Sequence, residues 1–152
     1  MYYQLEPEVA GGWGEGTVAD TTCHPPIVKS LVFEFDGWLG DSIITSFPCY
    51  LVTEGLAQSI NHTKLSGYHL AECTITQSEA FNELYPNKNL PGFLWLQVVG
   101  EFGVDDFGIG NDLRLVVSAA ALSTLKEHFL NNCEIEEISP VGRDETRVGD
   151  IQ

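Results

Sequence analysis

The chain has 152 residues, with 22 acidic and 7 basic side chains and a formal net charge of −15 at pH 7. Its length is that of one domain with a sizeable core, and its 43% of hydrophobic residues exclude a disordered acidic chain. The charge argues against binding to nucleic acid or to an anionic membrane, because both are polyanions that require a basic patch. Cationic partners are the expectation.

The first 36 residues predict two strands separated by irregular chain. Residues 1–6 form a short strand rich in tyrosine. Residues 11–16 contain four glycines, whose backbone entropy predicts a loop. Apolar and acidic side chains alternate over residues 31–36, with Leu31 and Phe35 among the apolar positions. This pattern predicts a half-buried strand.

Two short helices are predicted in the middle of the chain, each behind a hydroxyl side chain that can cap it. Thr53 precedes a helix with Leu56 and Ile60 on one side, and Ser78 precedes a helix over 79–84. Strands are predicted around 48–52, over 67–76 and over 93–99, the last of them covered on both faces.

The C-terminal part begins with a predicted buried strand over 113–117. Ser118 then caps a helix over 119–130, on which Leu122, Leu125 and Phe129 form one apolar stripe. Residues 134–138 predict a last strand or docked edge, and 140–152 have little to bury and predict a loosely held tail.

Together these elements predict an α+β fold, with a mostly antiparallel sheet and a few helices packed on one side. We expect a single domain over 1–139, followed by the tail 140–152. The predicted core consists of Phe33, Phe35, Leu94, Leu96, Leu115, Val117, Leu122, Leu125 and Phe129.

The N-terminus shows neither the basic region nor the apolar region of a signal peptide, and no apolar run approaches the ~20 residues that span a bilayer. Four cysteines, Cys23, Cys49, Cys73 and Cys133, are spread along the chain without a CxxC pair. We therefore expect a cytoplasmic protein with no membrane partner, whose cysteines are reduced thiols in or near the core.

A glycine-rich loop between two apolar strands carries the most conspicuous acids. Asp105, Asp106 and Asp112 lie in this loop, and Glu101 precedes them. Clustered carboxylates can hold a cation or pair with a partner's arginine or lysine, but aspartate is also frequent in ordinary turns. The spacing lacks the EF-hand pattern, so we expect a partner contact and no bound metal.

Two tryptophans are candidate anchors for a partner. Trp13 stands in the predicted glycine loop, and Trp38 is flanked by Asp36 and Asp41, two acids that we expect to belong to the same acidic partner-binding face. Exposed tryptophans often anchor interfaces, although Trp38 can equally be a rim residue that closes the core.

No catalytic signature accompanies these residues. Cys23 and His24 are adjacent, but neighbours in an extended chain point apart, and no GxSxG, HExxH or Walker-type motif occurs. We therefore expect no enzyme activity and no cofactor.

Between about 53 and 138 the chain has a pattern of core and turn residues, made up of 65–68, 90–96, Gly100, 105–108 and 113–118 with Leu122 and Leu125. On this pattern the stretch resembles small immunity proteins encoded beside toxins of bacterial polymorphic and contact-dependent secretion systems. The resemblance implies a protein that acts by binding a cognate toxin, without chemistry of its own. An acidic protein can also occupy the basic cleft of a toxin that attacks nucleic acids.

Two other functions are compatible with the sequence. One is a metal-dependent enzyme that uses Asp105, Asp106 and Asp112, and the other is an acidic regulatory or scaffolding domain without a toxin partner.

Overall fold

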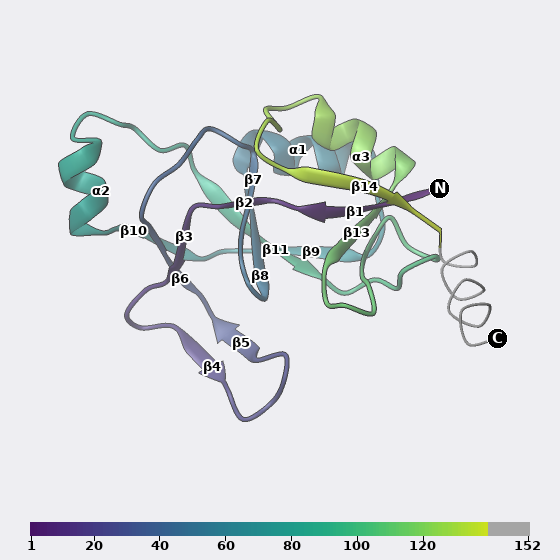
Figure 1. The fold of residues 1–152 in the computed structure, drawn as a ribbon, viewed down its shortest axis with the longest axis horizontal. Helices are drawn as coiled ribbons and strands as arrows, with labels where there is room; N and C mark the ends of the chain where they lie inside the picture. Colours follow the sequence, from purple (N-terminus) through teal and green to yellow (C-terminus); the bar gives the residue numbers. More distant parts are fainter. Residues whose placement is uncertain (140–152) are drawn as a thin grey trace.

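The N-terminal extended stretch contributes strands to three different sheets. In the computed structural model, which describes residues 1–139, it forms β1 (Tyr2–Glu6), β2 (Glu8–Val9) and β3 (Gly11–Trp13). Single residues, Pro7 and Ala10, separate the three strands. The chain therefore crosses the molecule in one extended pass, which brings its first residues and its last strand together (Figure 1).

The first sheet has the order β12-β13-β1-β14 and is antiparallel throughout. Its other strands are β12 (Phe107–Ile109), β13 (Leu115–Ser118) and β14 (Glu134–Ile138). Leu5 of β1 lies opposite Leu115 on one side and Ile135 on the other. The predicted last strand is thus an edge strand that pairs with β1.

The second sheet has the order β2-β7-β8-β11-β9, and only its β2–β7 pair is parallel. It contains β7 (Ile43–Ser46), β8 (Cys49–Thr53), β9 (Tyr68–Ala71) and β11 (Phe93–Val98). The strand that is buried on both faces is β8, not β11 as predicted, since Leu94 on β11 is only half-buried. The predicted strand over 67–76 is also wrong, because it divides into β9 here and β10 in another sheet.

The third sheet has the order β10-β6-β3, with β10 (Thr74–Gln77) parallel to β6 (Val32–Phe35) and β3 antiparallel to it. The predicted loop over 11–16 is therefore wrong in its first half. Glycine is needed there for close approach, because a Cβ atom on Gly11 would collide with the carbonyl oxygen of Glu34. The strands β4 (Val18–Asp20) and β5 (Ile27–Ser30) form a separate hairpin that projects from the body (Figure 1).

All three helices within residues 1–139 begin at predicted caps. The Oγ atoms of Thr53, Ser78 and Ser118 accept hydrogen bonds from the third residue after each, at 3.2, 3.0 and 3.1 Å. The helices are α1 (Glu54–His62), α2 (Glu79–Leu84) and α3 (Ala119–Lys126). Because α3 ends four residues earlier than predicted, Phe129 lies outside the helix and is 57% exposed, so its assignment to the core is wrong.

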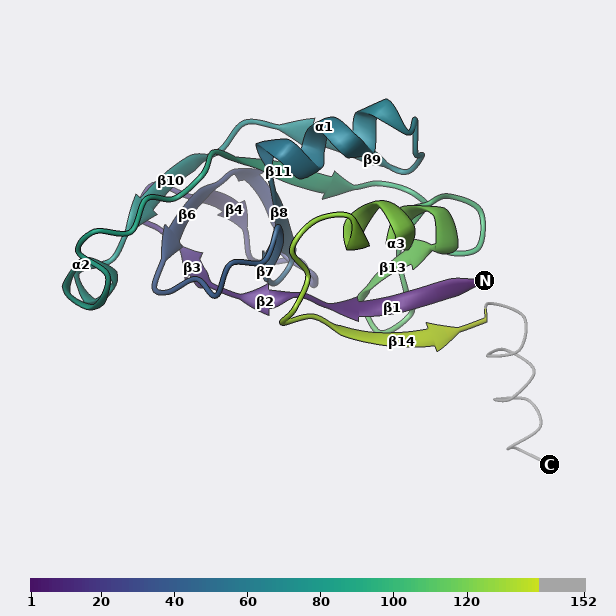
Figure 2. The same ribbon diagram turned by 90° about the horizontal axis from the view of Figure 1, so that it is seen from above.

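Two hydrophobic clusters lie on opposite sides of the second sheet. Tyr50 and Val52 of β8 belong to the first cluster with α1 and α3, whereas Cys49 and Leu51 belong to the second with Phe81 of α2. Successive side chains of a strand point to opposite faces, so a strand that is buried on both faces contributes alternate residues to the two clusters. Accordingly α1 and α3 pack together while α2 lies at the far end, so only two of the helices share a side (Figure 2).

The α+β class with mostly antiparallel strands is confirmed. Of the predicted core, Phe33, Phe35, Leu96, Leu115, Val117, Leu122 and Leu125 are buried. The predicted tail 140–152 lies outside the described residues. Within residues 1–139 no helix is long and apolar enough to cross a membrane.

Candidate partner-binding surface

The two adjacent aspartates of the glycine-rich loop hold the loop in place. Asp105 accepts a hydrogen bond from the backbone N–H of Glu101 at 2.8 Å. Asp106 accepts bonds from the backbone N–H of Ser66 at 2.9 Å and from the hydroxyl of Ser118 at 2.6 Å. Both carboxylates are half-buried. Their principal contacts are within the protein, which is the turn role that the sequence left open.

The remaining loop acids are more exposed than these two. Glu101 is exposed, and so is Asp112, whose carboxylate lies 3.8 Å from the guanidinium of Arg114. Across residues 1–139 no three histidine, cysteine, aspartate or glutamate side chains gather in a way that could hold a metal ion. Asp105, Asp106 and Asp112 thus do not form such a group within these residues.

Asp41 was predicted at an accessible acidic face, and this placement is wrong. Its side chain is fully buried and accepts hydrogen bonds from the backbone N–H groups of Asn131 and Asn132, at 3.0 and 2.8 Å. The Asn132 amide donates a further bond at 3.0 Å. Asp41 thus joins the loop before β7 to the chain before β14. The other acid beside Trp38, Asp36, is exposed.

Trp38 closes the rim of the second cluster. Its indole N–H donates to the carbonyl oxygen of Asp41 at 2.9 Å, and its ring meets that of Phe93 with centroids 5.7 Å apart. The ammonium of Lys88 lies 5.5 Å from the ring centroid. Trp38 is half-buried, so it contributes to the core and is also partly accessible to solvent.

Trp13 is not displayed on a loop, which corrects the prediction. It belongs to β3 and packs against the second cluster. Its indole nitrogen is buried, and the Trp13 side chain interacts with the thiol of Cys49.

The thiols are all free, as predicted, but they are not all in the core. Burial raises the pKa of Cys49 and Cys73 to about 11 and that of Cys133 to about 12. Cys23 is exposed instead, and its thiol donates to the Asp20 carboxylate at 3.6 Å. Its contact is therefore with an acid and not with the neighbouring histidine.

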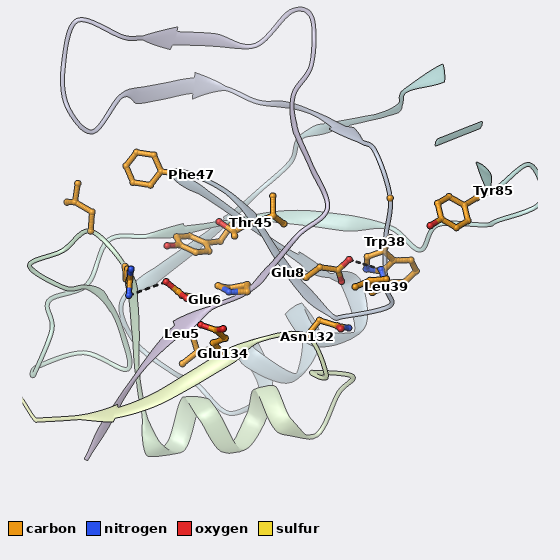
Figure 3. A pocket seen from close by; sticks show the side chains of 16 residues that line it. Leu5, Glu6, Glu8, Trp38, Leu39, Thr45, Phe47, Tyr85, Asn132 and Glu134 are labelled. Atoms are coloured by element: carbon orange, nitrogen blue, oxygen red, sulfur yellow. Dashed lines mark hydrogen bonds and ion pairs between the residues drawn. The ribbon is translucent and has the colours of Figure 1, made fainter. Parts of the chain in front are cut away.

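A groove of about 740 Å³ lies beside β1 and β2, where no sequence pattern predicted one (Figure 3). We call it the apolar groove; its walls include Leu5, Val9, Trp38, Leu39, Phe47 and Tyr50. Val9 and Leu39 are 73% and 64% exposed. Exposed apolar side chains around a concavity are typical of an interaction site.

Glu8 lies in the wall of the apolar groove. Its carboxylate accepts the backbone N–H of Leu39 at 2.6 Å, and a longer contact of 3.4 Å reaches the backbone N–H of Asp41. Burial raises the pKa of Glu8. A carboxylate therefore orders the loop that carries the exposed Leu39.

One end of the apolar groove meets an acidic strip, defined here as Glu6, Glu134 and Glu136. Glu6 on β1 is the direct cross-strand partner of Glu134 on β14, and Glu136 lies two residues further along the same face. Arg114 pairs with Glu6 at 3.1 Å. A hydrogen bond between the Glu6 and Glu134 carboxyl groups raises the pKa of Glu134. The sequence shows the acids of 134–138, but it does not show that they lie beside Glu6.

No family model, no curated protein and no solved structure matches this chain. The site is therefore interpreted from its own geometry: exposed apolar side chains around a groove, with carboxylates at its end and in its wall.

Proposed function

We propose that this protein is a non-catalytic, cytoplasmic binding protein that neutralises a cationic partner. The partner we favour is a cognate bacterial toxin domain, whose active cleft the protein would occlude in the manner of an immunity protein.

The observation that carries this proposal is acidic charge that the fold does not neutralise internally. The chain has a net charge of −15, and both ion pairs within residues 1–139 are made by Arg114. Glu101, Asp36 and Glu136 are exposed acids that lie far apart in the sequence. Such a surface attracts a basic protein and raises its association rate by roughly 10–10³-fold at low salt.

The test uses the polypeptide encoded by the adjacent gene. We expect a stable complex with this chain, whose association rate falls steeply with added salt, and protection of cells in which the neighbouring protein is toxic. Absence of both binding and protection would overturn the toxin assignment. Binding without toxicity would favour the scaffolding function instead.

A further inference from the structure

We propose that the apolar groove binds a segment of the partner in which an arginine or lysine is flanked by apolar side chains, with the cationic group at Glu6 and Glu134. This inference rests on the proposed function and specifies which part of the partner the protein recognises.

The exposed apolar side chains in the groove walls indicate that the bound segment also carries apolar side chains. Leu39 and Phe47 are 64% and 48% exposed. The loop of Leu39 is fixed by the Glu8 carboxylate, and Phe47 stands in the turn between β7 and β8. Covering these side chains removes apolar surface from water without reordering the protein, so a hydrophobic occupant gains affinity.

The two carboxylates of Glu6 and Glu134 at the end of the groove indicate that the segment carries a cationic group (Figure 3). Glu6 and Glu134 both line the groove and lie directly opposite each other on neighbouring antiparallel strands. Like charges in that relation are unfavourable, and a cation placed between them relieves the repulsion. Arg114 already binds Glu6 at 3.1 Å, so the local geometry accommodates a guanidinium.

Charge also selects among the possible occupants. A second copy of this chain carries the same net charge of −15, so two acidic rims would face each other. A basic segment of a different protein is complementary at the acidic end and compatible with the apolar walls. The occupant is therefore a cationic protein segment.

Nuclear magnetic resonance titration of the complete, nitrogen-15-labelled protein tests this inference. The probe is the capped tripeptide acetyl-Leu-Arg-Leu-amide, and the control is the same peptide with citrulline, the uncharged isostere of arginine. We expect saturable shifts at the amides of Glu6, Leu39 and Glu134, with affinity about tenfold weaker for the citrulline peptide. Absence of saturable shifts at millimolar peptide, or equal affinity for both peptides, would overturn the proposal.

A matched pair of variants locates the cation. The double variant Glu6→Gln and Glu134→Gln keeps the shape of the groove and should weaken binding of the arginine peptide about tenfold. Glu72→Gln removes an exposed charge just beyond β9, at the opposite edge of the second sheet from β2, and should leave binding unchanged. An equal loss in both variants would mean that net charge, not this site, governs binding.

The same variants separate this inference from the proposed function. If the complex with the neighbouring gene's product forms with unchanged affinity in the double variant, the groove assignment is wrong while the function stands. If the arginine peptide binds the groove but the neighbouring protein does not bind, the groove stands and the toxin assignment fails.

Discussion

The glycine-rich loop and the acidic strip are both rich in carboxylates, but they use them differently. In the loop, Asp106 is turned toward the Ser66 backbone and the hydroxyl of Ser118. In the strip, Glu134 and Glu136 are exposed on an edge strand. Acids that satisfy donors within the protein stabilise the fold, whereas acids that face one another or solvent remain available to a partner. Sequence alone does not distinguish these two uses.

The largest effect is expected at Asp41, an inward-facing acid. Asp41→Ala removes the acceptor of three hydrogen bonds from Asn131 and Asn132 and should lower the free energy of unfolding by about 3 kcal/mol. Asp36→Ala, five residues earlier and exposed, should change it by less than about 0.5 kcal/mol. Urea denaturation measures both, and equal losses would contradict the distinction.

A smaller loss is expected in the loop. Asp106→Ala removes the acceptor for Ser66 and Ser118, and Ser118 in turn caps α3, so unfolding should become easier by about 1–2 kcal/mol. Glu101→Ala is the control, with an expected change within about 0.5 kcal/mol. If Asp106→Ala were as stable as the control, the loop acids would be free for a partner after all.

An effect of opposite sign is expected in the strip. The pKa of Glu134 is raised in the folded protein, so its stabilising contribution is present below the ordinary pKa of 4.5 and is lost as the pH rises through the folded value. Glu134→Gln should therefore raise the Tm slightly at pH 7, and the difference from the parent should vanish near pH 3. A lower Tm of the variant at pH 7 would show that Glu134 stabilises the fold.

The smallest effect is expected from chemical labelling of the cysteines, which tests whether β14 stays paired with β1. Cys133 immediately precedes β14, and burial raises its pKa to about 12, so little thiolate is present at pH 8. With iodoacetamide we expect the exposed Cys23 to react first and Cys133 at least about tenfold more slowly, with four sites modified after denaturation without reductant. Mass spectrometry measures the rates, and equal native rates would indicate that β14 detaches from β1.

Local sequence patterns predict many of the helices and strands of this protein. Thr53, Ser78 and Ser118 predicted the starts of α1, α2 and α3, because a hydroxyl that accepts an N–H bond in the first turn acts within a few residues. The alternation around Phe33 and Phe35 predicted a buried strand face for the same reason. The end of α3 was missed, since the apolar stripe continued to Phe129 after the helix had stopped.

What the tertiary structure alone decided is which distant residues meet. The pairing of β1 with β14 brings Glu6 beside Glu134, and it depends on contacts between the two ends of the described chain, which no local pattern encodes. Asp41 and Asp36 have the same chemistry and similar neighbours, yet only Asp41 lies where the N–H groups of Asn131 and Asn132 need an acceptor. Periodicity and capping act over a few residues, whereas the burial of a carboxylate or the formation of a groove depends on segments brought together by folding.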